Sequence, residues 1–126
     1  MLSDQNSHKN MFDKINLGRE TLTLSKENNE KPITLNYGKL KRAALTLRSL
    51  NHPLRKRLIE MIDKKKESIV TTLYKELDIE QSVVSQHLAI LRRADILTTR
   101  RNGKFILYKV NKKRIKEVSD IIEQLV

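Results

Sequence analysis

The side chains in this sequence that are best suited to chemistry form hydrogen bonds or carry positive charge, and they gather in two segments. Residues 81–87 contain two glutamines, two serines and a histidine. Glutamine can pair with two atoms of an adenine, and serine can hydrogen-bond to several bases. Residues 100–104 place three basic side chains around an Asn-Gly pair, and such side chains bind phosphate or enter a minor groove. Both segments therefore predict contact with DNA.

The candidates for DNA contact lie in these two segments and just after the first one. They are Gln81, Ser82, Ser85, Gln86, His87, Arg92, Arg93, Arg100, Arg101 and Lys104. Some also have a structural interpretation. His87 could be a partly buried residue that braces its helix against a neighbouring hairpin. Arg92 and Arg93 could complement a helix dipole, and the charges at 100–104 could keep an exposed strand from aggregating.

Nothing in the sequence has the composition of a catalytic or cofactor site. The three histidines, His8, His52 and His87, lie far apart, and no glycine-rich phosphate loop is present. Such a set provides no nucleophile paired with a base. There is no cysteine, which excludes disulfides and thiolate metal ligands. We therefore expect neither enzymatic activity nor a cofactor.

The distribution of charge also favours a polyanionic partner. Residues 1–37 hold five basic and five acidic side chains, so the net charge of +11 lies in residues 38–126, as 21 basic minus 10 acidic. Such an excess suggests nucleic acid first, although an acidic protein would also satisfy it. The N-terminus lacks the apolar run of a signal peptide. No stretch approaches the roughly 18 apolar residues of a membrane span, so we expect a cytoplasmic protein without a membrane partner.

The chain divides by composition into a polar arm and one domain. We expect residues 1–37 to be a partly disordered N-terminal arm, with a linker at residues 26–32. Regular structure should begin near Leu40, within a domain that covers residues 38–126. A short element of the arm could dock on that domain through Met11, Phe12, Ile15 and Leu17.

Apolar residues at helical spacing predict four helices in the first part of the domain. The first spans residues 40–50, and the second runs from Pro53 to Asp63 because proline suits a first helical turn. Lys64 to Lys66 form a charged loop, and Thr71 is the expected N-cap of the third helix. After a tight turn at residues 78–80, the fourth helix continues to about Ala94, with a core face of Val84, Leu88 and Leu91.

The period of the apolar pattern changes to two after Asp95. Residues 96–101 and 104–110 read as strands joined by Asn102-Gly103, which favours a type I′ hairpin with positive φ at both residues. A last helix follows. Two helices joined by a short turn are typical of a helix-turn-helix, so the predicted fold is mainly α (α+β), a winged helix-turn-helix with a two-stranded wing.

Three segments of the chain resemble the ArsR/SmtB family of bacterial winged-helix repressors. Leu-Asn-His-Pro-Leu-Arg at residues 50–55 is similar to the start of that family's second helix. Gln-Ser-Val-Val-Ser-Gln-His-Leu at residues 81–88 resembles its recognition helix, and Arg-Arg-Asn-Gly-Lys at residues 100–104 its wing. The resemblance covers roughly residues 38–118 and implies a dimeric DNA-binding regulator.

Several residues depart from the family pattern. Asp78 and Asp95 stand where glycine is common, and aspartate tolerates a left-handed backbone better than most residues, so we expect the turns to be kept. Glu80 replaces a Ser or Thr cap, and its charge would repel phosphate. Gln86 stands where arginine is frequent, which changes the expected base preference.

The metal sites of the family have no counterpart in this sequence. Ile69 and Thr71 stand where its metal-binding members carry cysteine, and the last helix contains no histidine. Glu117, Asp120 and Glu123 alone are a poor set for zinc. We predict no metal response through these sites, which isothermal titration with zinc would test.

The first and last helices carry apolar stripes, although the other elements already provide enough apolar residues for a small core. The resemblance implies that they pair across a twofold axis, although both stripes could face the protomer's own core. The predicted dimer residues are Leu40, Ala43, Leu47, Leu50, Ile115, Val118, Ile122 and Leu125.

The function predicted from these features is sequence-specific transcriptional regulation, most simply repression by a homodimer on a palindromic operator. The alternatives are a non-specific or architectural nucleic-acid-binding protein and a winged-helix module that binds an acidic protein. No small-molecule or protein effector is indicated.

Overall fold

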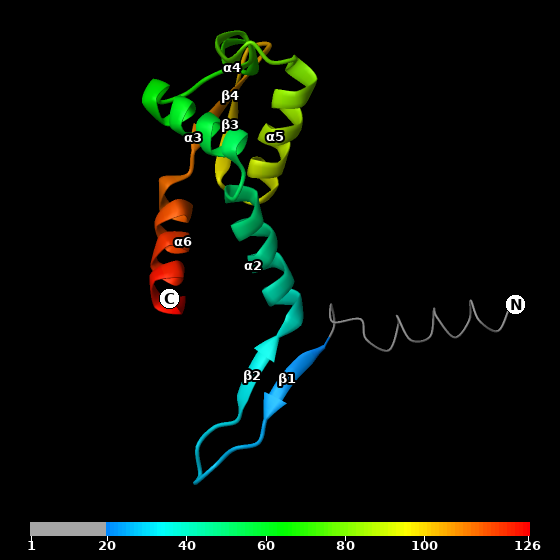
Figure 1. Ribbon diagram of the computed structural model, residues 1–126, viewed down its shortest axis with the longest axis vertical. Coiled ribbons are helices and arrows are strands. Elements are labelled where there is room, and N and C mark those ends of the chain that lie inside the picture. Colours follow the sequence, from blue (N-terminus) through cyan, green and yellow to red (C-terminus); the bar gives the residue numbers. More distant parts are fainter. Residues whose placement is uncertain (1–19) are drawn as a thin grey trace, which may run out of the picture. The chain divides into compact units, whose positions relative to one another are not determined.

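The computed structural model describes residues 20–126, and these divide into two compact units that meet inside one helix. The first unit extends to Ala44, and the second comprises Leu45–Val126 (Figure 1). The short element expected around Met11 and Leu17 lies outside the described residues. The division of the chain at residues 37 and 38 stays a prediction.

The first unit contains a β-hairpin that the sequence analysis did not expect. Strands β1 (Thr21–Leu24) and β2 (Ile33–Asn36) pair antiparallel, so regular structure begins well before Leu40. The segment predicted as a linker instead connects these strands, and it turns at Asn28 and Asn29, where φ is +48° and +66°. Asparagine tolerates this left-handed region better than most residues. Strand β2 leads directly into helix α2 (Tyr37–Leu50).

The second unit contains the predicted helix-turn-helix. Helix α3 (Pro53–Lys65) precedes α4 (Val70–Leu77) and the recognition helix α5 (Gln81–Arg93). Helix α3 includes Lys64 and Lys65, which were expected in a loop. Helix α4 begins one residue before Thr71, so the proposed cap was wrong; Ile69 stands at the N-cap without a side-chain bond. The core is formed mainly by Leu58, Ile62, Leu73, Val84, Leu88, Leu91, Ile96 and Leu97.

The two left-handed turns of the helix-turn-helix form on aspartate, as predicted. Asp78 caps the end of α4 with φ +54° and ψ +46°, and Asp95 follows α5 with φ +60°. A left-handed backbone costs most L-residues roughly 1–2 kcal/mol, and aspartate visits it more readily than most because its short side chain can hydrogen-bond locally. The missing glycines therefore do not disrupt the fold.

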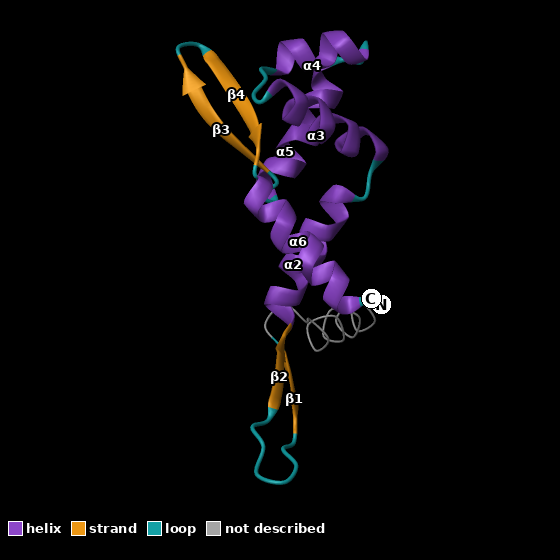
Figure 2. Cartoon of the chain, turned by 90° about the vertical axis from the view of Figure 1, so that its left-hand side faces the viewer, coloured by secondary structure: helices purple, strands orange, loops and turns teal. Residues whose placement is uncertain are grey.

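The wing is a two-stranded hairpin of β3 (Leu97–Asn102) and β4 (Phe105–Val110). It projects away from the helices of its unit (Figure 2). Its turn differs from the prediction, because Asn102 pairs with Phe105 and the central residues are Gly103 and Lys104. Only Gly103 of these has positive φ (+61°), as in a type II′ turn, which requires glycine at the first central position.

Two further features hold the wing and the C-terminal helix in place. Ser68 exchanges backbone hydrogen bonds with Tyr108 at 3.0 and 2.8 Å, which adds a third segment to the base of the wing. Helix α6 (Lys112–Leu125) starts at Asn111, whose side chain accepts a hydrogen bond from the Arg114 N–H. The order of α3, α4, α5 and the β3–β4 hairpin confirms the predicted winged helix-turn-helix fold.

Candidate nucleic-acid interface

Helix α5 presents two chemically different faces. Val84, Leu88 and Leu91 are fully buried, and they hold the helix against the core. Gln81, Ser82, Gln86, Arg92 and Arg93 are exposed, and Ser85 is half-buried. The face at the start of the helix therefore carries amide and hydroxyl groups that can reach base edges, since the N-terminal part of a recognition helix enters the major groove.

The start of α5 lacks a side-chain cap. Glu80 occupies the N-cap position with an extended backbone (φ −58°, ψ +139°), and its carboxylate accepts no capping hydrogen bond. A negative charge at a helix N-terminus interacts favourably with the helix dipole. The same charge stands beside Gln81, where a DNA phosphate would approach.

His87 belongs to a polar network beneath the recognition helix. Arg55 Nη1 lies 3.1 Å from His87 Nδ1, and because arginine has no acceptor, the histidine nitrogen accepts this bond. Arg55 also donates to the carbonyls of Ser49 and Arg48 at 2.6 and 3.2 Å. The His52 ring lies 4.6 Å from the His87 ring, centroid to centroid.

This environment opposes a positive charge on His87. Partial burial lowers the pKa of His87 below its ordinary value of 6.5, and unfavourable electrostatic interactions with His52 and Arg55 lower it further. The structural interpretation of His87 is therefore favoured, although the ring supports α5 against the start of α3 and not against the wing. Contact between His87 and DNA stays a prediction.

The wing contains one basic residue that is already paired. Arg100 Nε lies 3.0 Å from both carboxylate oxygens of Glu67, and its Nη2 lies 2.7 Å from one of them. The hydrogen bond from Arg100 lowers the pKa of the Glu67 carboxyl. Sequence analysis missed Glu67, which precedes the Ser68 bridge to the wing. Arg100 therefore helps to fasten the wing, and its availability to DNA is reduced.

The other charges of the wing are exposed near its turn. Arg101 and Lys104 lie in contact with solvent, and Lys104 Nζ lies 5.3 Å from the centre of the Phe105 ring. At the end of α5, Arg93 Nε donates to the Ala89 carbonyl at 3.3 Å. These exposed cations are suited to phosphate contacts, which position a protein on the duplex.

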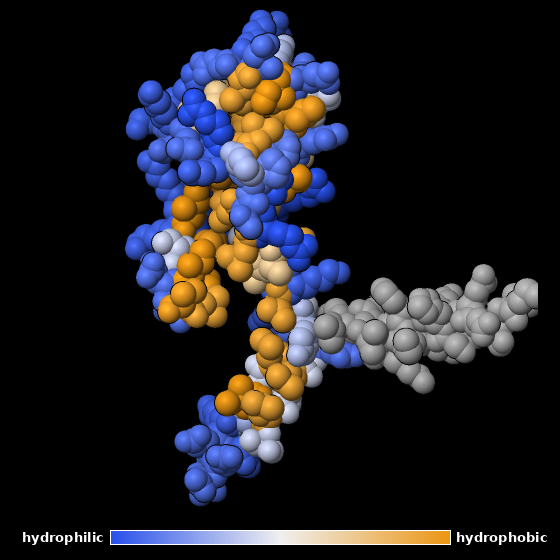
Figure 3. All heavy atoms as spheres, viewed as in Figure 1, coloured by the Kyte–Doolittle hydropathy of each residue, from blue (hydrophilic) through white to orange (hydrophobic). Residues whose placement is uncertain are grey.

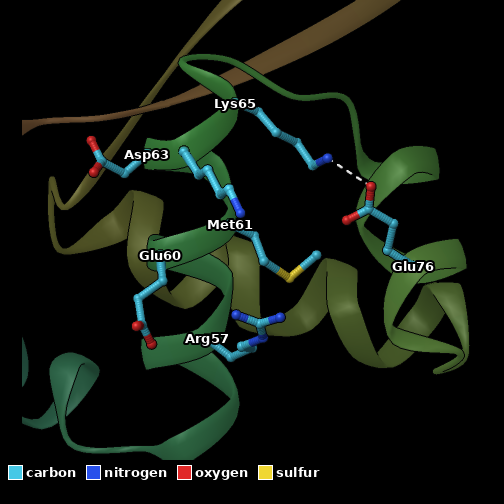
Figure 4. Close-up of a pocket in the computed structure, with 7 residues that line it drawn as sticks. Arg57, Glu60, Met61, Asp63, Lys65 and Glu76 are labelled. Atoms are coloured by element: carbon cyan, nitrogen blue, oxygen red, sulfur yellow. Dashed lines mark hydrogen bonds and ion pairs between the residues drawn. The ribbon is translucent and has the colours of Figure 1, made fainter.

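A hollow between α3 and α4 has a different character. It is lined by Arg57, Glu60, Met61, Asp63, Lys64, Lys65 and Glu76, and Lys65 pairs with Glu76 at 2.6 Å across it (Figure 4). Charges of both signs line this open depression. The ion pair joins the two helices, and the hollow offers no apolar enclosure for a small ligand.

Comparison with known proteins agrees with this geometry. A family model described as a helix-turn-helix domain matches residues 50–100. An HTH-type transcriptional regulator of Mycobacterium tuberculosis is 33% identical over 63 residues, which are 50% of this chain and 55% of the relative. The transcriptional repressor PagR of Bacillus anthracis is 29% identical over 91 residues, 72% of this chain and 91% of PagR.

Solved structures extend the likeness over most of the domain. The crystal structure of PagR aligns over 71% of this chain and 99% of its own, at 33% identity and a TM-score of 0.54. The chain belongs to the helix-turn-helix transcriptional regulators. An ArsR-like regulator from Rhodococcus has the same fold at 15% identity, with a TM-score of 0.62 over 70% of this chain and 82% of its own. The winged helix-turn-helix regulator expected from the sequence is thereby confirmed, and its fold is that of an ArsR-like regulator.

The apolar residues of the first and last helices of this helix-turn-helix regulator are only partly buried in its own core. Of the predicted dimer residues, Val118 is buried, Leu47 is half-buried, and Leu50 and Ile115 pack partly on the core. The others remain exposed, as do three aliphatic neighbours in these helices or at the C-cap of α6. The exposed set is Leu40, Ala43, Leu45, Ile121, Ile122, Leu125 and Val126.

The described part of the regulator contains neither a cluster of metal ligands nor a membrane-spanning helix. Within residues 20–126, no group of three or more His, Asp or Glu side chains is arranged to hold a metal ion. Across the same residues, no helix is both long and apolar enough to cross a membrane. The absence of a metal response stays a prediction.

Proposed function

We propose that this ArsR-like regulator binds DNA in a sequence-specific way and represses transcription as a homodimer. The observation that carries the proposal is the exposed polar face at the start of α5, which a fully buried apolar face holds in place. The relative PagR is a transcriptional repressor, which supports repression here. A repressor acts most simply by occupying promoter DNA, so the proposal also places the protein in the cytoplasm with its target.

The charge of the winged unit supports electrostatic attraction to the duplex. Residues 45–126 carry 18 basic and 10 acidic side chains, a net charge of +8. Neutralised phosphates release counterions, so binding should weaken steeply as salt rises. Such attraction does not depend on the DNA sequence. Specificity for particular bases would come from the polar side chains of α5.

A homodimer would explain the exposed apolar side chains of α2 and α6. Helix α6 exposes Ile121, Ile122 and Leu125, whose exposed fractions are 52%, 42% and 72%. An apolar face of this kind can pair with the same face of a second copy across a twofold axis. Two recognition helices would then reach successive major grooves about one helical turn (~34 Å) apart and read a palindrome.

Competition binding with selected and random DNA tests the proposal. Gln81→Ala should reduce the preference for the selected sequence, because a bidentate base contact contributes about 1–3 kcal/mol of discrimination. Arg101→Ala should weaken binding to both DNAs and reduce the salt slope by about 1. Lys113→Ala, an exposed charge on α6, serves as the control and should change neither. If Gln81→Ala left the preference intact while Arg101→Ala weakened all binding, the protein would be a non-specific binder.

A further inference from the structure

The β1–β2 hairpin has one apolar face that no described part of its own chain covers. Leu22 pairs with Leu35 and Leu24 with Ile33, so these four side chains lie on the same face of the two strands. Their exposed fractions are 42%, 40%, 48% and 67%, in that order. Thr21, Thr23, Thr34 and Asn36 form the opposite face. Figure 3 shows the apolar side chains along the strands and the hydrophilic tip beyond them.

A hairpin of this construction requires a partner. Two isolated strands are marginally stable in water, and a hydrophobic face must pack on something for the sheet to persist. All eight strand residues are exposed in the chain by itself. The leucine and isoleucine side chains therefore indicate an interface that residues 20–126 of the same chain do not supply.

The charge of the hairpin argues against nucleic acid as the occupant of this face. Residues 20–36 contain Lys26 and Lys31 against Glu20, Glu27 and Glu30, a net charge of −1. The positive charge of the chain lies after this segment. An apolar face on a slightly acidic hairpin suits a second apolar protein surface, and a twofold axis supplies one automatically because it brings identical faces together.

The hairpin is attached to the first turn of α2, one of the two helices in the proposed dimer. Tyr37 N donates to the Glu20 carbonyl at 3.0 Å, and Lys39 N donates to Asn36 Oδ1 at 3.0 Å. Both strands are thereby joined to the start of the helix within one compact unit. Leu40, 44% exposed, adds a further exposed apolar side chain to the part of α2 in that unit.

The size of the hairpin face shows that it would extend an interface and not form one by itself. Four half-exposed aliphatic side chains bury on the order of 200 Å². A standard interface buries roughly 800 Å² per partner. The hairpin can therefore contribute a minor part, and α2 and α6 must supply the rest.

We propose that the apolar face of the β1–β2 hairpin, formed by Leu22, Leu24, Ile33 and Leu35, is a dimerisation surface that packs against a second copy of this chain. It adds a contact by the first unit to the contacts that α2 and α6 make in the proposed dimer. This inference rests on the homodimer of the proposed function.

Sedimentation equilibrium of the full chain tests the inference with paired variants. Leu24→Thr/Ile33→Thr replaces one apolar cross-strand pair, and threonine preserves strand propensity so that the hairpin is retained. The matched control, Thr23→Val/Thr34→Val, changes the neighbouring pair on the opposite face. We expect the first variant to weaken the dimer at least tenfold and the control to stay within twofold of the wild type.

The outcomes separate the inference from the proposed dimer. A dimeric wild type that the threonine variant leaves unchanged would overturn the hairpin surface alone. Equal weakening by both variants would also overturn it, since the effect would then not depend on the face. A monomeric wild type at tens of micromolar would overturn the dimer itself.

A spin label gives a second readout, the local packing of the hairpin face, at concentrations where the wild type is dimeric. The chain has no native cysteine, so Leu22→Cys and Thr23→Cys can each carry one nitroxide. An immobilised label at residue 22 beside a mobile one at residue 23 supports the packed face, and equal mobility contradicts it.

Discussion

Arg55 connects the recognition helix to two other helices through one guanidinium group. It donates to the carbonyls of Arg48 and Ser49 near the end of α2, and to Nδ1 of His87 on α5. Lysine could not reproduce these contacts, because they use the rigid fork of the guanidinium group. The position of α5 therefore depends on a histidine that must stay neutral at Nδ1.

This dependence makes stability sensitive to acid. Since the pKa of folded His87 lies below its ordinary value of 6.5, the unfolded chain binds the proton more readily. The free energy of unfolding should therefore decrease as pH falls below about 6.5, and the loss from this residue should be complete below the lowered pKa. Urea denaturation between pH 5 and 8 measures the effect, and His87→Gln should show a flatter profile.

DNA binding by the same two proteins distinguishes the interpretations of His87. A histidine that contacted phosphate as a cation would strengthen wild-type binding as the pH fell, relative to His87→Gln. We expect no such gain, because the ring is held as a neutral acceptor. If DNA binding became stronger at low pH in the wild type but not in His87→Gln, the structural role of His87 would be contradicted.

Local sequence signals predicted which residues face outward, but not which of them are paired. The spacing of Val84, Leu88 and Leu91 placed Gln81 and Gln86 on the open face of α5, as the structure has them. The Glu67–Arg100 ion pair joins residues 33 positions apart. No periodicity within a helix or strand can indicate such a pair, because it depends on how the wing packs against the α3–α4 connection.

At the scale of the element, the uncapped start of α5 is a point where stability and DNA affinity can both increase. Glu80→Ser would place a hydroxyl in the extended N-cap geometry, and a serine cap contributes about 1 kcal/mol. Loss of the glutamate charge–dipole attraction would offset part of this gain. We expect a net increase in stability below 1 kcal/mol, measured by urea denaturation.

The same substitution should tighten DNA binding several-fold, since it removes a negative charge beside the expected phosphate. Glu123→Ser removes the same charge from exposed α6 and is the control. A similar gain in both variants would show that only net charge matters. Weaker binding by Glu80→Ser would contradict the placement of DNA at the start of α5.

Elements with a strong local pattern were predicted well, and those without one were missed. Helices α3 and α5 follow apolar spacing and differ from prediction by one or two residues at their ends. The β1–β2 hairpin alternates threonine and leucine over only four residues, within a polar segment that resembles a linker. The connection between β1 and β2 turns at Asn28 and Asn29 and contains no glycine, whereas Gly103 made the wing hairpin predictable from the sequence.

At the scale of the whole molecule, net charge is distributed unevenly along the chain, whereas exposed apolar side chains occur in both units. The winged unit carries the positive excess, whereas the segment at residues 20–36 is slightly acidic and exposes an apolar face. The positive excess fits DNA binding by the winged unit, and the exposed apolar side chains of the hairpin, α2 and α6 fit the proposed contact between two copies. Composition indicated the first role, but the second depends on strand register, which composition cannot give.

In-vitro selection of bound DNA, followed by hydroxyl-radical footprinting, tests the central claim most directly. A homodimer that reads DNA through α5 should select two inverted half-sites centred about one helical turn apart. Gln81→Ala should relax the preference at one position in each half-site, and protection should appear on one side of the duplex. A featureless pool of selected sequences with uniform protection would contradict sequence-specific recognition by α5.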